Sequence, residues 1–175
     1  MRTQALILLP ALILAAVPAG AQPPKNFVFT PSSSNGVCMV KFPGARLPGS
    51  DKTYDLQFSY RVRDGNFGVS LLVNGWDKAQ ANAESETVRP MTLAFDTGKS
   101  TTSRSGGYSS GYNDEAWGGW GPGAGSDAAF AMLPAATKVK VKFDSQDFGT
   151  VDLQMKGLAH VSLSQCAERV RAGKE

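Results

Sequence analysis

The sequence YDLQFSYRVRDGNFGVSLLV, residues 54–73, carries the strongest structural signal in the chain. Apolar and polar residues alternate strictly along its first half, which is the pattern of a strand with one buried and one solvated face. Asp64-Gly65 follows, a pair favoured in two-residue hairpin turns, and a second alternating run comes next. We therefore predict a β-hairpin in which Arg63 pairs with Asn66. This register places the apolar residues of both strands on one face.

A second hairpin and a helix are predicted near the C-terminus. Val139–Phe143 and Val151–Met155 both alternate, and pairing Val141 with Val151 keeps the two apolar sets on one face. Beyond Gly157 the apolar residues recur at helical spacing. The residues expected along the buried side of this helix are Ala159, Leu163, Cys166 and Val170.

Residues 97–125 differ in composition from the rest of the chain. They contain nine glycines in 29 residues, with aromatic residues between them. Because ordering glycine costs more backbone entropy than ordering any other residue, we expect this segment to be a long surface insertion.

The predicted fold class is mainly β, an antiparallel β-sandwich or barrel-like domain with one or two short helices, including a C-terminal helix. Further strands are expected at Val37–Phe42 and Val88–Phe95. Because Pro90 has no N–H to donate, the second of these either lies at a sheet edge or begins after the proline. The apolar faces of at least four alternating strands need a second layer to cover them. Six to eight strands would form these layers.

The first residues have the features of a signal peptide. Ala5–Val17 is apolar and shorter than the ~20 residues that a membrane span requires. Ala19-Gly20-Ala21 has the small-x-small pattern of a cleavage site. We expect residues 1–21 to be removed, residues 22–175 to form a single β-rich domain, and the protein to be periplasmic or secreted, without a transmembrane segment.

The two cysteines, Cys38 and Cys166, are predicted to form one disulfide, as is usual in exported proteins. The alternative is a pair of buried free thiols.

The charge of the chain does not indicate a particular class of partner. The whole chain has a formal charge of +3, and its charged residues alternate with apolar ones instead of clustering, so the sequence signals neither nucleic-acid nor anionic-membrane binding.

The sequence offers no clear catalytic or metal-binding constellation. Gly107–Gly111 matches the G-x-S-x-G nucleophile pattern, but that pattern has meaning only at a strand-to-helix turn of an α/β sheet. His160 is the only histidine, and we interpret it as a flanking helix residue. Asp144–Asp147 lacks the ligand number of a calcium loop and is typical of a turn. We expect no enzyme activity and no cofactor.

Four aromatic residues of the glycine-rich segment are the candidate ligand-binding residues: Tyr108, Tyr112, Trp117 and Trp120. Tyrosine and tryptophan bury a large area while keeping a polar group, so they can stack on sugars or anchor a protein partner. The alternative is that these rings fasten the segment to its own domain.

The run from Phe148 to Cys166, together with Val139–Phe143, resembles the C-terminal strand–glycine–helix segment of small exported proteobacterial proteins, among them the invasion-associated locus B family. The resemblance is confined to the C-terminal part of the chain. It implies a mostly β exported protein with a link to host-cell invasion, and it transfers no functional residue.

The function expected from the sequence is therefore that of a non-enzymatic exported interaction module, which binds a protein or an envelope glycan. A small envelope hydrolase and a structural envelope protein are the alternatives.

Overall fold

The computed structural model describes residues 28–30, 35–73, 75, 89–110 and 114–174. The expected signal peptide at 1–21 and the candidate residue Tyr112 lie outside these ranges. The described residues form two antiparallel sheets and two α-helices, one of them at the C-terminal end, which confirms the predicted fold class. Ten strands are present instead of the six to eight expected.

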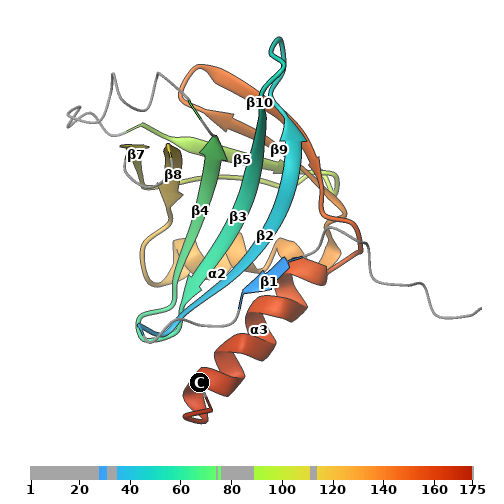
Figure 1. Ribbon diagram of the computed structural model, residues 1–175. Helices are drawn as coiled ribbons and strands as arrows, with labels where there is room; N and C mark the ends of the chain where they lie inside the picture. Colours follow the sequence, from blue (N-terminus) through green and yellow to red (C-terminus); the bar gives the residue numbers. More distant parts are fainter. Residues whose placement is uncertain (1–27, 31–34, 74, 76–88, 111–113, 175) are drawn as a thin grey trace, which may run out of the picture.

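The larger sheet has six strands in the order β1-β2-β3-β4-β8-β7. Their bounds are β1 Val28–Thr30, β2 Val37–Arg46, β3 Thr53–Arg61, β4 Asn66–Val73, β8 Glu115–Gly119 and β7 Ser105–Ser109. The long strands β2, β3 and β4 run side by side (Figure 1). Buried and partly exposed residues alternate along β3 and β4. The sheet therefore has an inner face, toward the second sheet, and an outer face.

The smaller sheet has four strands in the order β10-β9-β5-β6. Their bounds are β10 Gln146–Asp152, β9 Lys138–Phe143, β5 Met91–Phe95 and β6 Ser100–Thr102. Strand β5 begins directly after Pro90, since proline has no N–H to donate to the sheet.

Two helices and a short 3₁₀ turn complete the described fold: α2 Ala124–Phe130, η1 Leu133–Ala135 and α3 Leu158–Arg171. Helix α3 contacts β2, β3 and η1, with Leu163 and Cys166 buried as its spacing predicts. No helix among the described residues is long and apolar enough to cross a membrane.

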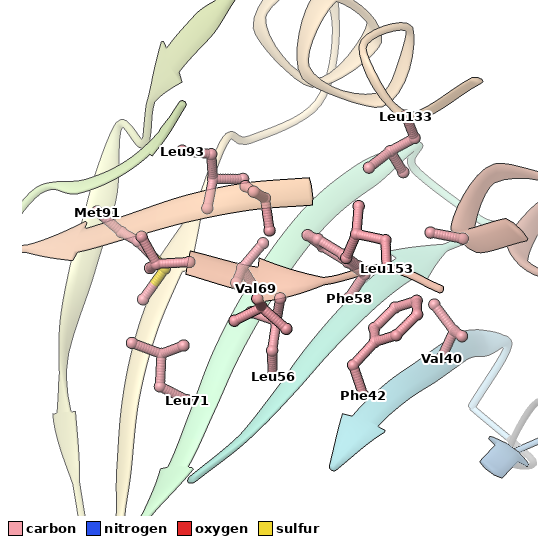
Figure 2. Packing of buried hydrophobic residues seen from close by; sticks show 14 of the residues in the cluster. Val40, Phe42, Leu56, Phe58, Val69, Leu71, Met91, Leu93, Leu133 and Leu153 are labelled. Carbon is pink, nitrogen blue, oxygen red and sulfur yellow. The ribbon is translucent and has the colours of Figure 1, made fainter. Parts of the chain in front are cut away.

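The core lies between the inner faces of the two sheets. Side chains of the larger sheet, such as Phe58 and Leu71, converge with Met91 and Leu93 of the smaller one (Figure 2). All four are fully buried. Burial of an aliphatic or aromatic side chain of this size contributes about 1.5–3 kcal/mol, so the alternating pattern that predicted the strands also provides the main stabilising term.

The hairpin of β3 and β4 forms, but its register differs from the prediction. Arg61, not Arg63, pairs with Asn66, and residues 62–65 make a four-residue turn. The N–H of Gly65 donates to the carbonyl oxygen of Arg61 at 2.9 Å, and Asp64 Oδ1 accepts from the Asn66 N–H at 3.2 Å. The side chain of Asp64 thus stabilises a longer turn. Because the shift is two residues, the buried face is the predicted one.

The hairpin of β9 and β10 is also shifted by two residues. Val151 pairs with Val139 instead of Val141, and the turn is shorter than predicted. The turn contains only Asp144 and Ser145, and a bulge in β10 then adds one residue, Phe148, which is fully buried. Because of this extra residue the net shift is even, and the apolar residues beyond the bulge stay on the predicted face. Asp147 lies 2.8 Å from the ammonium of Lys140.

Met155 was expected on the buried face of the last strand, but it is 45% exposed. Strand β10 ends at Asp152, and Gln154 then adopts a left-handed backbone with φ of 69°. The chain therefore leaves the strand pattern before Met155.

The glycine-rich segment is not a surface loop. It supplies β6, β7 and β8, which belong to both sheets. Gly106 and Gly118 pair on the inner face, where a Cβ on Gly106 would lie 2.1 Å from the carbonyl oxygen of Arg89. A Cβ on Gly118 would lie 2.6 Å from that of Met91. These glycines let β7 and β8 approach the start of β5, and this packing offsets the entropic cost on which the loop prediction rested.

The predicted disulfide is present. Cys38 on β2 and Cys166 on α3 are joined, with their Cα atoms 5.8 Å apart and 128 positions between them in sequence. Both cysteines are buried. The bridge attaches the C-terminal helix to the second strand of the chain.

Replacing both Cys38 and Cys166 with alanine should lower the free energy of unfolding by about 2–5 kcal/mol, because the unfolded chain loses a long closed loop. Urea unfolding of the variant and of the oxidised wild type measures the difference. Reduced wild-type protein is the control and should unfold like the variant. Equal stability of the variant and the oxidised protein would contradict this account.

Gly106→Ala should destabilise the domain by about 1–3 kcal/mol or more, because the contacted atom belongs to the backbone and cannot rotate away. Gly119→Ala is the matched control on the partner strand. Its Cβ would lie 3.0 Å from Ser105 Oγ, a side-chain atom that can move. Thermal unfolding should show a clear loss for the first variant and a small change for the second. A Gly106→Ala protein as stable as the control would disprove the close-approach role.

Candidate aromatic site on the outer sheet face

Trp117 lies on the outer face of the larger sheet. It pairs with Gly107 of β7 on one side and with Ser70 of β4 on the other. The row continues through Gln57 of β3 to Lys41 of β2. Residues paired across neighbouring strands project on the same side of a sheet, so Trp117 is the one aromatic side chain in a row of small and polar neighbours.

The indole of Trp117 lies over Gly107 of β7. A Cβ built on Gly107 would point away from the sheet and lie 3.3–3.4 Å from three indole atoms, Cζ2, Cε2 and Nε1. These three atoms form one edge of the indole, so the side chain leans across the neighbouring strand. The residue is still 37% exposed.

The side chains next to Trp117 on one side of its row are small. The next paired row toward the β3–β4 turn contains only small side chains on four strands: Ser105, Gly119, Gly68 and Ser59. Trp117 therefore stands on a nearly flat surface, where a planar ligand can approach the ring without a steric barrier.

Polar side chains lie on the same face. Glu115, two residues from Trp117 on β8, accepts from Ser109 Oγ at 3.4 Å. Farther across the sheet, Lys41 Nζ lies 3.7 Å from Asp55 Oδ2. These side chains and Gln57 present hydrogen-bond donors and acceptors beside an aromatic surface. That combination is common in sites that bind polyhydroxylated or peptide ligands.

Tyr108, on β7, points to the other side of the strand from Gly107. Its ring packs edge-to-face on Phe143 of β9 at 4.9 Å between centroids, and the guanidinium of Arg89 lies 5.3 Å from its centroid. Burial raises the pKa of the Tyr108 hydroxyl, with a smaller opposing effect from Arg89. Arg89 also pairs with Asp144 at 2.8 Å. Tyr108 thus connects the two sheets.

Trp120 is buried in the core and only 1% exposed. Its ring lies 5.4 Å from that of Phe67, and its Nε1–H donates to Thr101 Oγ1 at 2.7 Å.

The candidate residues are therefore not gathered in one site: Trp117 is exposed, Trp120 and Tyr108 pack within the domain, and Tyr112 lies outside the described residues. Trp117 and Trp120 are three positions apart, and residues an odd number of positions apart project from opposite faces of an extended chain. The sequence could have predicted this only if residues 115–119 had been assigned to a strand.

The remaining groups with shifted pKa values have nearby structural partners. A hydrogen bond from the Thr137 hydroxyl lowers the pKa of Asp96, and one from the Lys140 ammonium lowers that of Asp147. Burial raises the pKa of Tyr54, whose hydroxyl donates to the Phe148 carbonyl oxygen at 2.8 Å. His160 packs its ring against Phe130 at 4.9 Å.

Neither the G-x-S-x-G match nor the acidic residues form a recognisable catalytic or metal constellation among the described residues. The described part of the Gly107–Gly111 motif lies in and just after strand β7, where the hydroxyl of Ser109 bonds Glu115. Among the described residues, no group of three His, Cys, Asp or Glu side chains is placed to hold a metal ion.

Comparisons with known proteins do not assign the chain to a family. No protein-family model, no curated protein and no solved structure matches it. The resemblance of its C-terminal part to the invasion-associated locus B family stays a prediction, and the functional argument rests on this chain's own residues.

The two tryptophans should respond differently to truncation. Trp120→Ala removes a fully buried ring and should cost about 3–5 kcal/mol of stability. Trp117→Ala should cost less than about 1 kcal/mol, because the ring contacts mainly the surface of β7. Chemical unfolding of both variants checks this. Equal losses would show that Trp117 is also a core residue and would remove it as a binding candidate.

Proposed function

We propose that the protein is a non-enzymatic, exported interaction module that binds a glycan on the outer face of its six-stranded sheet, with Trp117 as the central contact. The observation that supports this most directly is the place of the indole. It lies over Gly107 on the outer face of the sheet and is 37% exposed.

A glycan fits this surface better than a protein anchor does. A pyranose ring presents a flat face of C–H groups that packs against the π face of an indole, and its hydroxyls can bond to side chains at the ring's edge. Gln57 and Ser70 lie in the Trp117 row and can serve this purpose. A protein hot spot, in contrast, usually inserts an aromatic ring into a pocket of its partner, whereas Trp117 leans over the neighbouring strand of its own sheet.

Export of the protein is part of the proposal. A buried disulfide is typical of proteins that fold in an oxidising compartment, and the Cys38–Cys166 bridge is compatible with periplasmic or secreted placement.

Titration with soluble glycans tests the proposal. The probes are the delipidated core oligosaccharide of a lipopolysaccharide and soluble disaccharide fragments of peptidoglycan. The indole N–H signal of Trp117 in a two-dimensional NMR spectrum should shift with one of them. The signal of Trp120, which is buried and hydrogen-bonded to Thr101, should stay in place and serves as the internal control.

Trp117→Ala should weaken binding of the responding glycan by about tenfold or more, with the thermal unfolding midpoint nearly unchanged. If neither glycan shifts the Trp117 signal at millimolar concentration, the glycan proposal is wrong. Loss of a co-purified envelope protein in the Trp117→Ala variant would then favour a protein interface at the same face.

A further inference from the structure

Cationic side chains gather at one end of the domain, although they come from two segments that are distant in sequence. Arg61 ends β3 and Arg63 lies in the turn that follows. The last turn of α3 and the residues after it carry Arg169, Arg171 and Lys174. All five are exposed. In Figure 1 the β3–β4 turn and the C-terminal end of α3 lie at the same lower end of the domain.

Two contacts bring these segments together around Gly36. The N–H of Val62, between the two arginines, donates to the carbonyl oxygen of Gly36 at 2.9 Å. A Cβ on Gly36 would lie 3.8 Å from Val170 Cγ1 of α3. Arg169 and Arg171 flank Val170, so the helix end and the hairpin turn meet on either side of one glycine.

The charge at this end is unbalanced. Against the five cations, the described residues of these two segments hold two acidic side chains, Asp64, which lies 3.3 Å from Arg61, and Glu168 of α3. The other described residues are nearly neutral, with 10 Lys and Arg against 9 Asp and Glu. Most of the net positive charge of the described chain is therefore concentrated here, where it attracts anions.

An open hollow lies within this end. It has a volume of about 560 Å³ and is lined by Asn35, Val37, Arg61 and Arg63. Two guanidinium groups beside an amide match the oxygens of a phosphate group, because arginine donates in a fork that phosphate accepts in bidentate fashion. The hollow is larger than one phosphate, so it has room for the group that carries it.

The hollow opens on the same sheet face as Trp117. Val37, Arg61 and Asn66 form one paired row of the outer face. The Trp117 row crosses β3 at Gln57, four residues from Arg61, and β8 is two strands from β3. From strand geometry the two sites are about 17 Å apart. A short oligosaccharide can span that distance.

We infer that the glycan bound at Trp117 carries phosphate groups, and that Arg61 and Arg63 bind one of them in this hollow. The inference rests on the proposed glycan-binding function. It adds the substrate class: a phosphate-substituted saccharide, neutral where it stacks on Trp117 and anionic toward the β3–β4 turn.

The experiment compares one glycan with and without phosphate. The delipidated core oligosaccharide of a lipopolysaccharide is titrated into the full chain, intact and after hydrofluoric acid removes its phosphate esters. The intact form should bind about tenfold more tightly at low salt, and the difference should shrink as salt is raised. Arg61→Gln/Arg63→Gln should abolish the difference while leaving binding of the dephosphorylated form unchanged.

Lys138→Gln/Lys142→Gln is the matched control, because it removes the same charge from exposed positions on the outer face of the other sheet. This variant should behave like the wild type. Thermal unfolding of all variants confirms that they are folded.

The outcomes separate the two proposals. Equal affinity for both oligosaccharide forms, with Trp117→Ala still weakening each, overturns the phosphate inference and leaves the glycan-binding function standing. If the protein binds phosphatidylglycerol vesicles and Trp117→Ala does not change that binding, the hollow is assigned to lipid headgroups instead. The phosphate inference would then be overturned. If millimolar inorganic phosphate displaces the oligosaccharide completely, and does so equally in the Trp117→Ala variant, the hollow is a nonspecific anion site. That result would also overturn the phosphate inference.

Discussion

The close approach of the two sheets at Gly106 and Gly118 is the constraint on which most of the structure depends. At this point the carbonyl oxygen of Arg89 and the Cβ of Met91 occupy the space that side chains on β7 and β8 would need. The contact joins the end of the six-stranded sheet to the start of β5. It also fixes which residues of β7 and β8 face inward, and so it directs Trp120 into the core and Trp117 to the outer face.

The faces of the strands could be predicted from the sequence, but their registers could not. Alternation identifies which side of a strand is buried, and it was correct for both hairpins except at Met155. A shift of two residues leaves that alternation unchanged, so hydrophobicity cannot distinguish the observed register from the predicted one. Local features made the choice: Asp64 stabilises a longer turn in one hairpin, and a shorter turn with a bulge at Phe148 sets the register of the other.

The candidate site was predictable in composition but not in geometry. Aromatic residues in a glycine-rich segment suggested binding, and Trp117 is exposed as a binding residue must be. The same composition suggested a loop, because the entropic cost of ordering glycine is visible in a sequence while the close packing that offsets it is not. The arginine hollow was beyond sequence reasoning for a related reason. Its charges look dispersed along the chain, and only the fold brings Arg61 and Arg63 to the same end as Arg169 and Arg171.

The position of the disulfide has a consequence for that cationic end. Cys38 is two residues from Gly36, and Cys166 is one helical turn before Val170, so the covalent bond holds together the two segments that meet there. In a reducing compartment the helix end would be retained by side-chain packing alone, and the gathered charges would be free to separate by mutual repulsion. The concentration of positive charge at this end is thus coupled to thiol oxidation, because reduction removes the covalent link between the helix that carries Arg169 and Arg171 and the strand that follows Gly36.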